Sequence, residues 1–242
     1  MDFKPIVREH AASGADITVV SHTGEYYSED IKKSTVLNVG DDGYVKSVLI
    51  NPDLSGTCTT SLNIFVMGKD FLVDMIQDSI ARGNVSFEKD ILQAKCSELK
   101  IKTYEYSKYF SKITNMQSYF RANMELLNAE NAKKLFAPKK PIYTKVSDNA
   151  PAKYDLDCKV KNALIADGCI IEGEVENSIL FRGVKIGKGA KVKNCILMQG
   201  TQVGDNAEVN YLITDKNVKI SDNHILTGAK TYPMYVGKGA SV

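Results

Sequence analysis

Histidine is the side chain most often used as a general base near neutral pH. Of the three histidines, only His224 lies in the last third of the chain, a region of short repeats. Acyl transfer would need such a histidine in a cleft between repeats. His224 occupies the place that Ala190 and Ala207 take in earlier repeats, and no partner side chain is evident. This place favours a packed or half-buried histidine over a catalytic one.

The cysteines and a group of lysines are the other side chains that could bind a metal or an anion. Five cysteines stand at positions 58, 96, 158, 169 and 195, and none forms a Cys-x-x-Cys pair. This spacing supports neither a zinc site nor a disulfide framework and is typical of a reducing cytoplasm. We expect Cys169 and Cys195 to be small buried residues. Lysines at 185, 188, 191 and 193 could bind an anionic effector, although a charged outer surface is the commoner meaning.

A six-residue phrase recurs four times, at residues 160–165 (VKNALI), 175–180 (VENSIL), 192–197 (VKNCIL) and 209–214 (VNYLIT). The starts are 15, 17 and 17 residues apart. The segments between punctuating residues are too short for helices, and Val and Ile are typical of strands. Repeats of this length are stable only when they stack. The sequence therefore predicts a parallel β-helix of the hexapeptide kind.

Stacking should align equivalent residues of successive coils. We expect two inward columns, one of Val160, Val175, Val192 and Val209, the other of Leu164, Ile179, Ile196 and Ile213. Asn162, Asn177 and Asn194 form a third column, which could be a binding stripe. A ladder of corner residues is the favoured interpretation, because asparagine tolerates the left-handed backbone conformation.

The region before the repeats has the pattern of an α/β domain. Residues 2–21 predict a helix that leads into a strand, and residues 35–50 a hairpin around the turn at 40–43. A strand at 61–66 precedes helices at about 70–82 and 116–128. Linker-like sequence predicts α/β material over residues 1–140, a linker at 141–156 and the β-helix at 157–242.

Composition narrows the class of protein. The 242 residues are 43% hydrophobic and 25% charged, with a net charge of +2. This balance gives no basic surface for nucleic acid or an anionic membrane. The sequence contains neither an apolar run of membrane-spanning length nor a signal-peptide core.

Five segments resemble the ADP-glucose pyrophosphorylases, which are glucose-1-phosphate adenylyltransferases. They are residues 14–18 (GADIT), 61–65 (SLNIF), 119–127 (YFRANMELL), 167–173 (DGCIIEG) and 177–187 (NSILFRGVKIG). The resemblance implies a nucleotidyltransferase domain followed by a left-handed β-helix. The family's phosphate-cradling loop, GGxGxRL, is not found, so we expect the chain to begin about midway through the nucleotidyltransferase domain.

The family's active-site motifs are degenerate where they can be aligned. Its Glu-Lys-Pro appears as Ile50-Asn51-Pro52, and asparagine cannot supply the lysine's charge to a sugar phosphate. Asn63 replaces a glycine beside the sugar. Lys112 replaces the aspartate that helps to hold Mg²⁺ and would repel the metal. We therefore predict no catalytic residues and no metal or other cofactor.

Three aligned residues retain two interpretations each. Ser61 could contact a sugar phosphate or bond to its own backbone, the favoured interpretation. Asp90 could be a relic ligand or a capping carboxylate. Lys112 could pair with an acidic partner residue or lie in solvent, which is the default.

This pattern resembles the GlgD type, a noncatalytic branch of the family that partners a catalytic pyrophosphorylase in glycogen synthesis. It implies a cytoplasmic regulatory subunit, catalytically inactive alone, in a homo- or hetero-oligomer. A fragment of an active adenylyltransferase lacking its ATP-binding half is the alternative. An acyltransferase is a weaker one. Open sheet edges and the flat end of a solenoid also predict self-association rather than a monomer.

Overall fold

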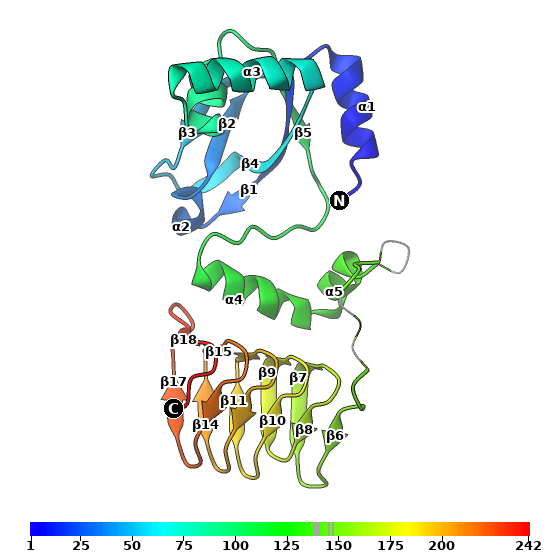
Figure 1. Cartoon of the computed structure of the whole chain (residues 1–242), viewed down its shortest axis with the longest axis vertical. Helices are drawn as coiled ribbons and strands as arrows, with labels where there is room; N and C mark the ends of the chain where they lie inside the picture. The colour runs from blue at the N-terminus through cyan, green and yellow to red at the C-terminus, as the bar shows by residue number, and fades with distance from the viewer. Residues whose placement is uncertain (138–140, 145, 147) are drawn as a thin grey trace. The chain divides into compact units, whose positions relative to one another are not determined.

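The computed structural model describes residues 1–137, 141–144, 146 and 148–242 and divides into two compact units, Met1–Lys108 and Tyr109–Val242 (Figure 1). Residues 138–140, 145 and 147, in and before the predicted linker, lie outside the described residues.

The first unit is a five-stranded sheet with helices. Its strands follow the order β3-β2-β4-β1-β5, in which β1 and β5 are parallel and the other neighbours antiparallel. Its elements are α1 (Lys4–Ser13), β1 (Ile17–Tyr26), α2 (Ser28–Ile31), β2 (Thr35–Val39), β3 (Val45–Ile50), β4 (Gly56–Met67), α3 (Lys69–Arg82), the π-helix η1 (Phe87–Gln93) and β5 (Ile101–Glu105).

Local sequence explains these boundaries. Gly14 and Gly83 end α1 and α3 in the left-handed conformation, with φ of 63° and 72°. The hairpin of β2 and β3 closes at Gly40, whose N–H donates to the carbonyl of Tyr44. Ile17, Met75 and other apolar residues of the sheet, α3 and η1 form the buried core. The elements predicted over residues 2–82 are therefore confirmed.

In its described residues, the second unit has three short helices followed by a parallel β-helix. The helices are α4 (Met116–Met124), the 3₁₀-helix η2 (Glu125–Leu127) and α5 (Ala129–Leu135). The strands are β6 (Lys153–Tyr154), β7 (Lys159–Ile165), β8 (Ile170–Ile171), β9 (Glu174–Leu180), β10 (Lys185–Ile186), β11 (Lys191–Lys193), β12 (Ile196–Leu197), β13 (Gln202–Val203), β14 (Glu208–Asn210), β15 (Leu212–Thr214), β16 (Lys219–Ile220), β17 (Ile225–Thr227) and β18 (Met234–Val236).

The valine column has the predicted register. Val160 pairs with Val175, Val175 with Val192, and Val192 with Val209, all in parallel strands. The last three are at most 1% exposed and lie in the solenoid core. Val160 is 40% exposed, because no strand of the described residues pairs with the outer edge of β7.

The second predicted column has the right register but the wrong face. Leu164, Ile179, Ile196 and Ile213 align as expected. Ile196 and Ile213 nevertheless pack against Phe120 of α4, whereas their neighbours Cys195 and Leu197 point into the solenoid core. Side chains alternate along a strand, so Ile196 must face outward when Cys195 and Leu197 face inward. A helix covers this outer column.

Residues 109–136 belong to the same compact unit as the solenoid rather than to that of the sheet. Helix α4 contacts β9, and η2 contacts β7 and β9. We predict that the nucleotidyltransferase-like domain ends at residue 140. The grouping of residues by contacts differs from that boundary, which stays a prediction.

The expectation for His224 is wrong. Ala190 and Ala207 are fully buried, but His224 in the last coil is exposed. No later coil of the described chain stacks over this position, so the side chain remains in solvent.

Candidate functional site

Ile50 ends β3 and Asn51 follows it, and the resemblance predicts that these two residues replace the family's Glu-Lys pair. Ile50 is partly buried and packs against the sheet core. Asn51 has a φ of 51°, and its backbone N–H donates to the carbonyl of Ser34 at 2.9 Å. The pair therefore fits a strand end, and it offers no charge to a phosphate.

Ser61 and Asn63 lie at a bulge inside β4. Val19 pairs with Phe65 but Ser21 pairs with Ser61, so β4 carries extra residues here. Asn63 takes the left-handed conformation, with a φ of 56°. Its N–H donates to the buried Ser61 hydroxyl at 3.0 Å. Local backbone bonding by Ser61 is confirmed, although it lies within the strand, and a sugar phosphate contact remains a prediction.

Asp90 is a capping carboxylate, as one of its two interpretations expected. Its Oδ2 accepts from the backbone N–H groups of Val85 and Ser86, each at 2.9 Å. These two bonds hold the pKa of the Asp90 carboxyl below its usual value. A carboxylate used in this way supports the turn before η1.

Lys112 is partly buried in the second unit, just before α4. The side chain of Asn115 caps that helix by accepting from the N–H of Ser118 at 2.7 Å. A lysine has no ligand atom for Mg²⁺ while it is protonated, so this position does not fit the metal used by the family. Within the described ranges, no three His, Cys, Asp or Glu residues are placed to hold a metal ion.

Sequence reasoning missed a polar cluster between the second half of β1 and the end of β5. The carboxylate of Glu105 accepts from the N–H of Thr23 at 2.8 Å and lies 3.5 Å from His22 Nδ1. His22 Nδ1 also lies 2.9 Å from the carbonyl oxygen of Tyr106. Burial raises the pKa of nearby Tyr26, whose hydroxyl accepts from Thr60. His22 and Tyr106, and likewise Thr23 and Glu105, are more than 80 residues apart, so no local signal joins them.

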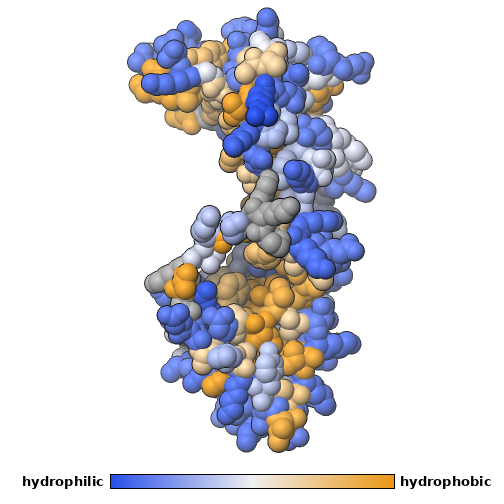
Figure 2. Space-filling model, turned by 90° about the vertical axis from the view of Figure 1, so that its right-hand side faces the viewer, coloured by the Kyte–Doolittle hydropathy of each residue, from blue (hydrophilic) through white to orange (hydrophobic). Residues whose placement is uncertain are grey.

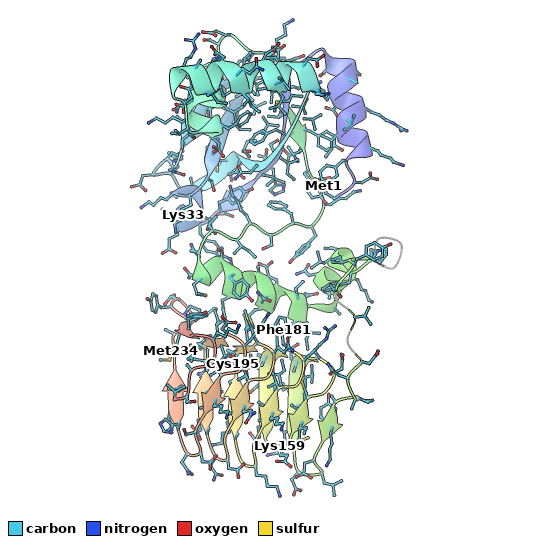
Figure 3. All side chains as sticks on the ribbon, in the orientation of Figure 1. Met1, Lys33, Lys159, Phe181, Cys195 and Met234 are labelled. Atoms are coloured by element: carbon cyan, nitrogen blue, oxygen red, sulfur yellow. The ribbon has the colours of Figure 1, made fainter. Side chains whose placement is uncertain are left out.

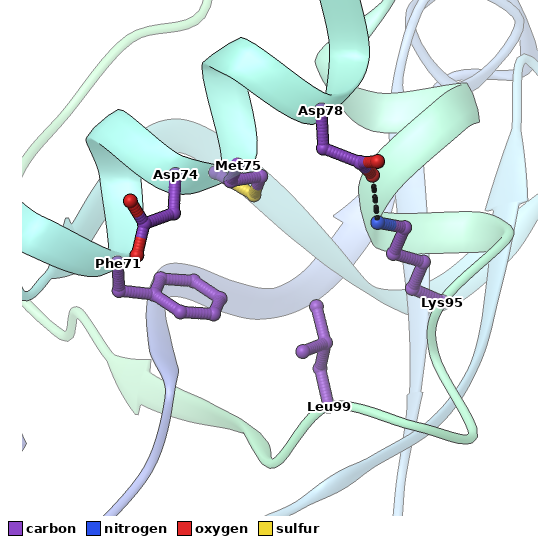
Figure 4. Close-up of a pocket in the computed structure, with 6 residues that line it drawn as sticks. All are labelled: Phe71, Asp74, Met75, Asp78, Lys95 and Leu99. Carbon is purple, nitrogen blue, oxygen red and sulfur yellow. Dashed lines mark hydrogen bonds and ion pairs between the residues drawn. The ribbon is translucent and has the colours of Figure 1, made fainter. Parts of the chain in front are cut away.

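A small hollow of about 230 Å³ lies between α3 and the segment after η1 (Figure 4). It is lined by Phe71, Asp74, Met75, Asp78, Lys95 and Leu99. Lys95 Nζ bonds to Asp78 Oδ2 at 3.0 Å, and Arg82 bonds to the other carboxylate oxygen. These cations, Arg82 first, lower the pKa of Asp78. The carboxylate is thus engaged in ion pairs and is poorly suited to acid–base chemistry.

A larger groove of about 580 Å³ lies within the second unit. It is lined by Phe120, Met124, Leu127, Asn128, Asn162, Asn177, Asn194, Tyr211 and Lys230. The three column asparagines have φ between 47° and 50°, and Asn162 Nδ2 donates to Asn177 Oδ1 at 2.8 Å. The corner-ladder interpretation is therefore confirmed. The same amides line the groove, so a binding role for the column remains a prediction.

Comparison with known proteins adds to this geometry. Residues 149–230 match the family model for the GlmU-like, C-terminal hexapeptide. The chain is 42% identical over 132 residues to the glycogen biosynthesis protein GlgD of Bacillus subtilis (strain 168), covering 54% of this chain and 38% of that protein. It is 36% identical over 192 residues to GlgD of Geobacillus stearothermophilus, covering 79% of this chain and 46% of the relative.

Glucose-1-phosphate adenylyltransferases are also similar to this chain. Glucose-1-phosphate adenylyltransferase of Geobacillus stearothermophilus is 30% identical over 196 residues, covering 79% of this chain and 50% of that enzyme. The chain spans about half the length, or less, of the curated relatives it matches. It is thus a relative of the GlgD glycogen biosynthesis proteins and the glucose-1-phosphate adenylyltransferases, with an α/β region followed by a left-handed β-helix of hexapeptide repeats.

Proposed function

We propose that the chain works in glycogen biosynthesis as a noncatalytic subunit that associates with a catalytic glucose-1-phosphate adenylyltransferase. Its similarity to proteins of both names supports this role. The observation that carries the proposal is the chemistry of the aligned positions. Ile50 and Asn51 bring no charge to a sugar phosphate, and Lys112 brings a cation where the family holds a metal.

These substitutions bear on the reaction in a specific way. Nucleotidyl transfer depends on positioning and on neutralising negative charge as the phosphoryl group moves. A side chain that cannot bind Mg²⁺ removes part of that neutralisation. We infer that the chain contacts the catalytic subunit in the cytoplasm and regulates or stabilises it. None of the helices in the described residues is long and apolar enough to cross a membrane.

The test compares three samples: this chain, the catalytic adenylyltransferase of the same genome, and their mixture. Pyrophosphate release from ATP and glucose 1-phosphate is measured with Mg²⁺ present. We expect none from the chain alone, and a changed kcat or KM in the mixture relative to the catalytic subunit. Turnover by the chain alone near one per second, within the ordinary enzyme range, would overturn the proposal. So would a mixture that neither co-purifies nor differs kinetically.

A further inference from the structure

The first long strand of the solenoid leaves one edge open. Strand β7 pairs with β9 over six residue pairs, from Lys159 with Glu174 to Ile165 with Leu180. Among the described residues, no strand pairs with its other edge. An edge of this length offers a row of backbone N–H and C=O groups to another chain.

Apolar side chains are exposed at the same end. Val160 and Leu164 are each 40% exposed, whereas Val192 and Ile196, their equivalents in a middle coil, are fully buried. Leu156 just before β7 is fully exposed. Figure 2 views the molecule from the side on which β6 and β7 lie in Figure 1, and hydrophobic residues gather on this face of the solenoid. A further strand stacked here would cover them.

Over the first three coils, the charges in two columns of the stack alternate in sign. Lys159, labelled in Figure 3, pairs with Glu174, and in the same column Lys191 pairs with Glu208. The distances are 2.8 and 2.6 Å. The adjacent column runs from Lys161 to Glu176 to Lys193, with distances of 3.2 and 3.5 Å. Each lysine pair is thus stacked on a glutamate pair, and β7 ends the series with lysines.

A second copy of this chain does not continue the pattern. Stacked head to tail, its last coil would bring Ile225 and Thr227, which occupy the same two columns, against Lys159 and Lys161. Stacked head to head, lysines would face lysines, and like charges opposite one another destabilise paired strands. The edge therefore discriminates against its own copy.

We propose that β7 is a docking edge for a β-strand of a different polypeptide that carries carboxylates two residues apart. Residues two apart lie on one face of a strand, so the two carboxylates can meet Lys159 and Lys161 in either strand direction. Backbone bonds supply the attachment, and the charge pairs select the partner and its register. We identify that polypeptide as the catalytic adenylyltransferase, and this identification alone rests on the proposed function.

The charge rule can be tested with this chain alone, because reversing the edge creates an acidic strand. Tagged wild-type chain is mixed with untagged Lys159→Glu/Lys161→Glu chain, and retention is compared with that of untagged wild-type chain. The untagged control Lys185→Glu/Lys219→Glu changes the same net charge on exposed lysines of another sheet of the solenoid. Circular dichroism confirms that each variant is folded.

We expect the edge-reversed chain to be retained several-fold more than wild type or control, and the excess to vanish at about 0.5 M salt, where charges are screened. Equal retention of all three chains would overturn the docking edge. Equal retention is what we expect if Lys159 and Lys161 only prevent other strands from pairing with this edge.

A second experiment tests the identity of the partner. Wild type, Lys159→Glu/Lys161→Glu and the Lys185→Glu/Lys219→Glu control are each co-purified with the catalytic adenylyltransferase. We expect several-fold less of the edge-reversed chain in the complex than of the other two. If all three bind equally, the docking edge is overturned while the proposed function stands. If wild type does not bind, the proposed function fails, and the two-chain experiment alone decides the docking edge.

Discussion

Among the residues that the structure describes, eight of the nine non-glycine residues with a positive φ are asparagines. Asparagine is the residue that best tolerates this conformation after glycine, because its short polar side chain bonds locally. In the solenoid, asparagine side chains form hydrogen bonds at the same positions where the backbone has a positive φ. Asn194 has a φ of 50°, and its Nδ2 donates to Asn210 Oδ1 at 2.9 Å. The corners are held by backbone conformation and by bonds along the stack.

These two contributions can be separated by substitution. We expect Asn194→Ala to lower the free energy of unfolding by about 1–3 kcal/mol, through loss of the bond and a strained backbone. Asn194→Gly keeps the conformation and should cost less. Asn210→Ala removes the same bond without a positive φ and is the matched control. Denaturant unfolding measures all three; equal losses for Asn194→Ala and Asn210→Ala would show that conformation contributes nothing.

Cysteine chemistry follows from burial. Cys195 is fully buried, and desolvation raises the pKa of its thiol to about 12. The thiol therefore stays protonated at neutral pH, and the thiolate is the reactive form. We expect Cys195 to resist alkylation by iodoacetamide at pH 8 in the native protein, while the partly exposed Cys158 reacts. Mass spectrometry of peptides reads out both sites; native labelling of Cys195 at the rate of Cys158 would contradict the burial.

At the scale of elements, the solenoid and α4 share a hydrophobic surface. Phe120 lies among Ile196 and Ile213, and its ring centroid is 6.1 Å from that of Tyr211. Buried apolar side chains on both faces of one strand explain why Ile196 and Leu197 are each 0% exposed. One face packs inside the coil and the other beneath a helix.

A double-mutant cycle tests that arrangement. Phe120→Ala and Ile196→Ala should couple by about 0.5–3 kcal/mol, because they remove two sides of one contact. Leu197→Ala is the control, since Leu197 faces the inside of the coil. It should be additive with Phe120→Ala to within about 0.5 kcal/mol. Chemical denaturation measures the free energy of unfolding of each variant. If the effects of Phe120→Ala and Ile196→Ala are additive, the packing of α4 on the outer column is contradicted.

On the scale of the whole molecule, exposed ion pairs run along the solenoid while its core is apolar. Lys159 lowers the pKa of Glu174, and Lys161 lowers that of Glu176, first by hydrogen bonds and then by charge. A carboxyl whose pKa is lower in the folded state stabilises the protein above its unfolded pKa. That stability is lost as the pH falls through the folded pKa.

The expected pH dependence has a definite direction. The melting temperature should begin to fall as the pH drops below the ordinary glutamate value of 4.5. The Glu174→Gln/Glu176→Gln chain should show a smaller fall over the same range, because it lacks these two titrating groups. Glu130→Gln in α5 is the control for removal of an exposed carboxylate. Identical pH profiles for the double variant and wild type would contradict a contribution from the ladder.

Local sequence determined the repeats, their register and the strand-and-turn character of the coil. Phrases spaced by 15 and 17 residues can align only by stacking, and Gly and Asn at the corners set the turns. The helix, hairpin and strands of the first unit were likewise predictable, because capping residues and apolar periodicity act over a few positions. That Ile50, Asn51 and Lys112 lack the charge and metal-binding chemistry of the family's site is a prediction from residue type alone.

Tertiary structure decided which faces are covered. Ile196 faces outward and is buried only because Phe120, 76 residues earlier, folds over it. His224 is exposed because no strand of the described residues stacks over its coil, although its sequence position matches buried alanines. His22 and Glu105 meet because β1 and β5 pair across more than 80 residues of chain. Burial and long-range pairing depend on what packs against a residue, and the spacing of its neighbours in sequence does not contain that information.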